Sequence, residues 1–144
     1  MTDEATMASL EAMRAASLDE LEETTWPPPP DGAGHLQRRC HELRRVPLGQ
    51  FGVEDVRIML SQQIGTQFLL PMAVGMLAVS PLAEGDYYPG DLLMAVLQLP
   101  KSAWNGHEAA AGVLGQVLAH IDLSNPDLGE VADAIRGWLA NRPV

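Results

Sequence analysis

Cysteine and lysine are almost missing from this sequence. Its 144 residues include one cysteine, Cys40, and one lysine, Lys101. A single cysteine excludes an internal disulfide and a zinc site built from several cysteines. It also fits the reducing cytoplasm, where we expect this protein to be found.

Long hydrophobic runs are absent as well. The longest, residues 68–79, spans twelve positions and contains Pro71 and Gly75, whereas a membrane-spanning helix needs about 20 apolar residues. Residues 1–23 are acidic and lack the apolar segment of a secretory signal. We therefore expect no contact with a membrane and interpret residues 68–79 as part of a buried helix.

Aromatic side chains make up only 5% of the residues, while hydrophobic residues make up 47%. The core must therefore be aliphatic, which favours packed helices over a β-sandwich. The helical spacing of apolar residues predicts an all-α fold: a single compact domain of about six helices around an aliphatic core, ending in an antiparallel helical hairpin. We expect residues 1–17 to be a flexible or frayed segment and residues 18–144 to form one helical domain. After a short helix at residues 18–23, the expected helices cover residues 35–45, 53–64, 66–79, 92–99, 108–121 and 128–140.

Positive charge is scarce, since nine basic residues face nineteen acidic ones and the net charge is −10. This argues against direct binding of nucleic acid, whose phosphates require a basic surface. It is compatible with a basic protein partner, because opposite charge speeds encounter and favours the correct complex. The alternative interpretation is that the acidity only aids solubility.

The basic residues gather in one predicted helix. Residues 32–45 hold four arginines and one acid, whereas residues 1–31 hold eight acids and one base. In this helix Leu36, Cys40 and Leu43 have the spacing of a buried face, and we expect the arginines to be exposed or paired with the acidic N-terminal segment. Four consecutive prolines at residues 27–30 predict an extended connection before it.

No catalytic set is evident, and we predict that the protein is not an enzyme. The four histidines have no metal-binding spacing, so we predict no catalytic residue, no metal site and no cofactor. One alternative remains open: Asp86 and Asp91 flank a turn and could act together in hydrolysis or in holding a metal ion. Asp91 also stands where a residue would cap the next helix.

Several short motifs occur in a recognisable order. They are LDELE at residues 18–22, WP at 26–27, RCHELRRVPL at 39–48, VEDVR at 53–57, LPMA at 70–73 and PLAEGDYYPGDLL at 81–93. This order resembles the immunity proteins of bacterial contact-dependent growth inhibition systems. The resemblance covers roughly residues 18–100, and the C-terminal helices match only in being amphipathic.

The resemblance implies a protein that binds a toxin domain in the cytoplasm and occludes its active site. Many such toxins are nucleases, whose active sites are basic, so an acidic inhibitor would match them. As the toxin-binding surface we single out exposed acids and tyrosines in one loop, Glu84, Asp86, Tyr87 and Tyr88, since tyrosine is favoured at interface centres. The alternative function is a helical scaffold or regulatory interaction domain with no toxin partner.

Overall fold

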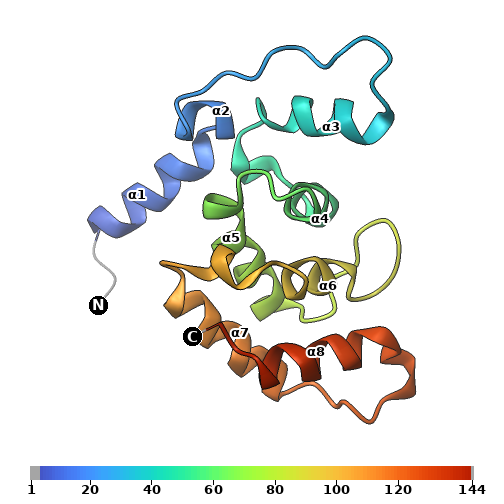
Figure 1. Ribbon diagram of the computed structural model, residues 1–144. Helices are drawn as coiled ribbons and strands as arrows, with labels where there is room; N and C mark the ends of the chain where they lie inside the picture. The colour runs from blue at the N-terminus through green and yellow to red at the C-terminus, as the bar shows by residue number, and fades with distance from the viewer. Residues whose placement is uncertain (1–3, 144) are drawn as a thin grey trace.

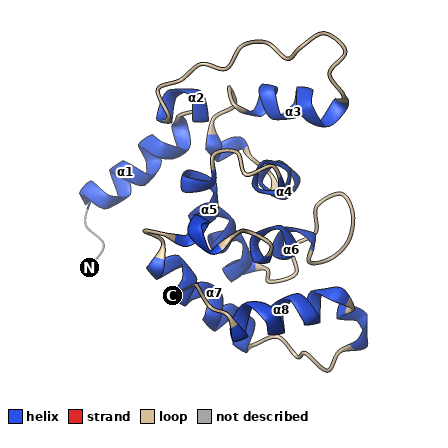
Figure 2. Ribbon diagram, viewed as in Figure 1, coloured by secondary structure: helices blue, strands red, loops and turns tan. Residues whose placement is uncertain are grey.

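The computed structural model describes residues 4–143, and within them helices are the only extended secondary structure. Eight α-helices are joined by loops and three 3-10 turns (Figures 1 and 2). The described part of the chain contains no strand, only one isolated bridge between Glu84 and Pro89. This confirms the all-α prediction. The α-helices are α1 (Glu4–Ala15), α2 (Leu18–Leu21), α3 (His35–Leu43), α4 (Val53–Ser61), α5 (Thr66–Val79), α6 (Asp91–Leu97), α7 (Glu108–Ala119) and α8 (Glu130–Ala140); the 3-10 turns are η1 (Leu48–Gln50), η2 (Lys101–Trp104) and η3 (Pro126–Leu128).

Helices α4, α5 and α6 form the centre of the molecule (Figure 1). α4 packs on both α5 and α6, α7 packs on α5, α8 packs on α6, and α3 covers α4. One continuous hydrophobic cluster connects them, from Leu18 near the N-terminus to Trp138 in α8. Most of its members are Leu, Val, Ile, Met and Ala, as the scarcity of aromatic residues predicted.

Local signals explain several helix ends. Ser17 Oγ accepts the amide of Glu20, and the Glu20 carboxylate accepts the amide of Ser17, so the predicted capping box forms at α2. The helix expected at residues 53–64 ends earlier, at Ser61, with Gln62 as its C-cap. Gly65 is the N-cap of α5 and has a φ of 66°, a conformation that favours glycine. α5 then continues through Pro71, which lies on its exposed side, while Leu69, Leu70 and Ala73 are buried.

The C-terminal part differs from the prediction in detail. α7 and α8 are consecutive, but α7 packs mainly on α5 and α8 mainly on α6, so the predicted hairpin is loose. α8 begins at Glu130 rather than near residue 128, because Gly129 has a φ of 53° and breaks the helix. The short helix expected at residues 18–23 forms as α2, and α1 adds a further helix to the six longer ones that were expected.

The N-terminal helix α1 packs against η1. The carbonyl of Ala16 accepts the amide of Leu48 at 3.0 Å, which joins the end of this segment to the domain. Fraying of residues 1–17 in solution stays a prediction; residues 1–3 lie outside the described part. None of the helices between residues 4 and 143 is long and apolar enough to cross a membrane.

Candidate functional site

The loop between α5 and α6 is folded around the carboxylate of Asp91. Asp91 Oδ1 accepts the amide of Gly85 at 2.7 Å, and Oδ2 accepts the amide of Tyr87 at 3.1 Å. Asp91 itself is only 4% exposed. The prediction that it caps α6 is therefore wrong: Gly90 occupies the cap position with a φ of 95°, and Asp91 is the first residue of the helix. Its carboxylate turns back and fixes the loop.

Glu54 and Arg57 of α4 also contact this loop. Arg57 donates from Nε and Nη2 to the two carboxylate oxygens of Glu54, both at 2.6 Å. Glu54 Oε1 also accepts the amide of Asp86 at 3.0 Å. The Arg57 guanidinium lies 4.7 Å from the centre of the Tyr87 ring and 3.8 Å (Nε to Oδ2) from Asp91. Two charged residues of one helix thus fix the backbone and one ring of the loop.

The contact between Glu54 and Arg57 shifts the pKa values of both side chains. The hydrogen bonds from Arg57 hold the pKa of Glu54 below its ordinary value, although partial burial opposes the shift. The Glu54 carboxylate in turn raises the pKa of Arg57. Both groups therefore stay ionised at neutral pH, and the loop is held by charge-assisted hydrogen bonds, which are stronger than neutral ones.

All four residues singled out as a toxin surface, Glu84, Asp86, Tyr87 and Tyr88, are exposed on this loop. Tyr87 is 71% exposed and Tyr88 41%. The loop projects beside α4 and α6 in Figure 1. The structure thus presents two aromatic rings and two acids together on a held loop.

A hollow of about 420 Å³ lies between this loop, α4 and the start of α3. His35 and Leu36 line it from α3, and Asp86 and Tyr87 from the loop. Leu36 was expected on the buried face of its helix, but it is 45% exposed. The prediction fails because Leu36 lines this hollow and does not pack into the hydrophobic core. This exposed leucine next to Tyr87 adds an apolar element to the surface.

Glu54 and Arg57 were missed as members of this site. Their spacing of three residues on a helix indicates an ion pair, but nothing in the sequence places that pair against a loop 27 or more residues later. The structure shows that two of the ordered motifs, VEDVR at 53–57 and PLAEGDYYPGDLL at 81–93, meet here.

Three other motifs, LDELE at 18–22, WP at 26–27 and RCHELRRVPL at 39–48, meet near the N-terminus. Arg44, 1% exposed, pairs with Asp19 at 2.8 Å and with Glu22, and its guanidinium lies 4.6 Å from the centre of the Trp26 ring. Arg45 donates to the carbonyl of Trp26 at 3.2 Å. This confirms that arginines of the basic helix pair with the acidic N-terminal segment. Arg38 is exposed, and Arg39 pairs instead with Asp55 at 3.0 Å and with Glu42 at 3.2 Å.

The geometry gives little support to a hydrolytic pair at Asp86 and Asp91. Asp91 is buried, and each of its oxygens accepts a backbone amide of the loop, so its carboxylate faces the loop and not solvent. Burial raises the pKa of the Cys40 thiol, which disfavours the reactive thiolate. Between residues 4 and 143 no three His, Cys, Asp or Glu side chains gather as metal ligands would.

Comparison with known proteins gives one positive finding. A family model described as CDI immunity proteins matches residues 20–112, almost two thirds of the chain. The match includes α3 to α6, and therefore the loop between α5 and α6 together with Glu54, Arg57 and Asp91, which hold it. No curated protein and no solved structure shows significant similarity to the chain.

Proposed function

The chain belongs to the family of contact-dependent growth inhibition (CDI) immunity proteins, and we propose that it neutralises a basic nuclease toxin by covering the toxin's active site. Membership of the family supports an immunity function against a CDI toxin. The proposal adds the class of toxin, the mode of inhibition, a cytoplasmic complex and the surface that makes the contact. That surface is the 84–88 loop, defined as residues Glu84 to Tyr88.

The net charge of −10 supports a basic partner. A nuclease active site is built to receive phosphates, so it presents cationic side chains. An acidic inhibitor would be drawn to such a site and would repel the nucleic acid that competes for it. The exposed carboxylates of Glu84 and Asp86 carry this charge on the proposed contact surface.

The single observation that carries the proposal is that the exposed loop is held in place. Its backbone is bonded to Asp91 and Glu54 at three amides, those of Gly85, Asp86 and Tyr87. Binding through a held loop loses little conformational entropy, so more of the contact energy appears as affinity. Loops fixed on a helical scaffold are common places for binding residues.

The test uses the toxin domain encoded by the neighbouring gene. We expect a one-to-one complex that stops the toxin from degrading nucleic acid, and co-expression that rescues cells. The double variant Tyr87→Ala/Tyr88→Ala should weaken binding by at least about 30-fold, the effect of losing a hot spot worth 2 kcal/mol. Glu84→Ala/Asp86→Ala should mainly slow association and reduce its dependence on salt.

The matched control is Glu11→Ala/Glu108→Ala, which also removes two negative charges, but from exposed positions on α1 and α7. If this control weakens binding as much as Glu84→Ala/Asp86→Ala does, the loop is not the contact surface and only total charge matters. A toxin without nuclease activity, or one still active in the complex, would remove the proposed target or mechanism while leaving the family membership intact.

The alternative is a scaffold or regulatory domain that uses the acidic N-terminus and the proline run. In the structure Trp26 and Pro27 are already engaged within the chain, since their carbonyls bond to Arg45 and His41 at 3.2 and 2.9 Å. Pro28 and Pro30 remain exposed. Replacing these two prolines by alanine should leave toxin binding unchanged under the main proposal and abolish partner binding under the alternative.

A further inference from the structure

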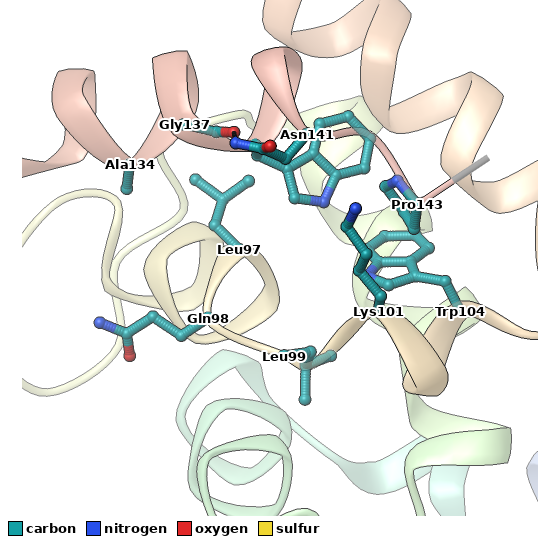
Figure 3. Close-up of a pocket in the computed structure, with 10 residues that line it drawn as sticks. Leu97, Gln98, Leu99, Lys101, Trp104, Ala134, Gly137, Asn141 and Pro143 are labelled. Atoms are coloured by element: carbon teal, nitrogen blue, oxygen red, sulfur yellow. Dashed lines mark hydrogen bonds between the residues drawn. The ribbon is translucent and has the colours of Figure 1, made fainter.

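Two hollows of nearly equal size in the surface differ in charge. One, of about 430 Å³, lies between the end of α6, η2 and α8 (Figure 3). Among the described residues that line it, Lys101 is charged and none is acidic. The other, of about 420 Å³, is the hollow between the 84–88 loop, α4 and the start of α3, and Glu54 and Asp86 stand in its wall. We call it the loop hollow, and its acidic wall makes it the one that suits a cation.

Part of the wall of the loop hollow is apolar. Leu36 of α3 is 45% exposed, and together with Ile58 of α4 and the ring of Tyr87 it lines the hollow. The volume of the hollow is more than ten times the roughly 30 Å³ that one water molecule takes up in the liquid, so a side chain can enter. Exposed apolar groups around a hollow favour an occupant with an apolar stem.

Positive charge is short around the loop hollow. Arg57 lines it, but its guanidinium already donates to the two carboxylate oxygens of Glu54, both at 2.6 Å. Asp91 adds a further carboxylate, 3.8 Å from Arg57 Nε. The Asp86 carboxylate forms no ion pair with any of the described residues, and only the backbone amide of Asp86 bonds to Glu54. Arg57 is therefore engaged elsewhere, and a cation from a partner would find Asp86 unpaired.

The other groups of the wall suit a guanidinium in particular. The guanidinium of Arg57 already lies 4.7 Å from the centre of the Tyr87 ring. Because Tyr87 is 71% exposed, its ring has room for a second guanidinium, whose plane stacks on aromatic faces in a way that an ammonium cannot. His35, Ser61 and Gln62 also line the hollow. They offer hydrogen-bond acceptors, and a guanidinium has several N–H donors and no acceptor.

We propose that the loop hollow receives an arginine side chain from the toxin's active site, where that arginine would otherwise hold a phosphate of nucleic acid. This docking rests on the proposed function, because it requires a basic nuclease as the partner. The aliphatic stem of the arginine lies on Leu36 and Ile58, and its guanidinium stacks on Tyr87 and pairs with Asp86. Opposite charge guides the arginine in, whereas the ring and the leucine slow its release. The toxin thereby loses a phosphate contact, which gives a direct cause for its inhibition.

The experiment is a double-mutant cycle with the toxin domain encoded by the neighbouring gene. Each arginine of the toxin is replaced in turn by methionine, and surface plasmon resonance at pH 7 measures its dissociation from the wild type and from Leu36→Ala/Tyr87→Ala. We expect one arginine whose loss speeds dissociation at least about 10-fold from the wild type but less than about 2-fold from the double variant. The same replacement should weaken the binding of nucleic acid by the toxin. Lysine at that position should keep fast association, since the charge remains, without restoring slow dissociation.

The control on this chain is Val113→Ala in α7, because Val113 is 41% exposed and thus close to Leu36 in exposure. Leu36→Ala alone should speed dissociation of the unmodified toxin at least about 3-fold, since part of an apolar contact is lost. Val113→Ala should leave the dissociation rate unchanged. Circular dichroism should show both variants folded, as expected for truncations at exposed positions.

Three outcomes would overturn the docked arginine. They are a complex in which no toxin arginine couples to Leu36 and Tyr87, a lysine that replaces the arginine without faster dissociation, and a Leu36→Ala variant that dissociates as slowly as Val113→Ala. In each of these cases the complex still forms, and the proposed function stands. If the toxin forms no complex at all, the proposed function fails and the docked arginine with it, so the two failures can be told apart.

Discussion

The guanidinium of Arg44 lies 2.8 Å from the carboxylate of Asp19, twenty-five positions earlier in the chain, and both groups are shielded from solvent. Arg44 also donates to the carbonyl of Thr24 at 3.2 Å and pairs with Glu22. A charge removed from water in this way must be paired, because an unpaired buried charge is strongly destabilising. This pair therefore joins α2 to the end of α3.

Replacing Arg44 tests that role. Arg44→Met should lower the free energy of unfolding by about 3 kcal/mol, since it leaves Asp19 without its partner in a site that is 9% exposed. Urea denaturation followed by circular dichroism measures the change. Arg38→Met, at an exposed position of the same helix, is the control and should alter stability by less than about 0.5 kcal/mol. Equal midpoints for the two variants would contradict a stabilising role for the pair.

Two truncations at the N-terminus should affect folding to different extents. A chain that begins at residue 17 loses α1 and its packing on η1 but keeps Asp19, so it should still unfold cooperatively. A chain that begins at residue 32 loses the partners of Arg44 together with Leu18, which is fully buried in the core, and should not fold into a stable domain. Thermal unfolding monitored by circular dichroism distinguishes the two. A cooperative transition in the shorter chain would show that α2 is dispensable.

Gly85 should not tolerate a side chain. A Cβ there would collide with Glu54 Oε1 and lie 3.0 Å from Asp91 Oδ2, the two carboxylates that hold the loop. Gly85→Ala should destabilise the protein by about 1–3 kcal/mol, as overpacking does, and should weaken toxin binding as well. Hydrogen exchange at the amides of Asp86 and Tyr87 would show the loosened loop.

The matched control is Gly112→Ala in α7, where an added Cβ meets no atom within 4 Å. Alanine is a better helix former, so this variant should gain about 0.5–1 kcal/mol without changing toxin binding. If Gly85→Ala behaves like this control, the loop is not closely held by Glu54 and Asp91.

The support from Glu54 should depend on pH. Arg57 lowers the pKa of Glu54 in the folded protein below its ordinary value of 4.5. A lowered folded pKa means that the stabilisation is fully present above the unfolded value and is lost as pH falls through the folded value. The difference in unfolding free energy between the wild type and Glu54→Gln should thus be constant from pH 7 to about pH 5. It should shrink below pH 4.5. A difference that grows toward low pH would contradict this assignment.

Much of the architecture could be predicted from the sequence, because it follows from local chemistry. The aliphatic composition and the spacing of apolar residues predicted helices, and Ser17 marks the start of α2 where the structure has it. The pairing of the basic helix with the acidic segment was also predictable, since opposite charges in neighbouring segments attract. Leu36 was misplaced because periodicity identifies a helix face but not whether other side chains fill the space in front of it.

The sequence by itself determined the fold class, the aliphatic core, the four exposed residues of the 84–88 loop and, through its ordered motifs, the family. Only the tertiary structure decided what holds that loop. Asp91 looked like a helix cap because capping is the commonest local use of an Asp before a helix, yet its oxygens bond to Gly85 and Tyr87. Glu54 reaches Asp86 across 32 positions. Such contacts depend on how α4 packs against α6, which no local pattern encodes.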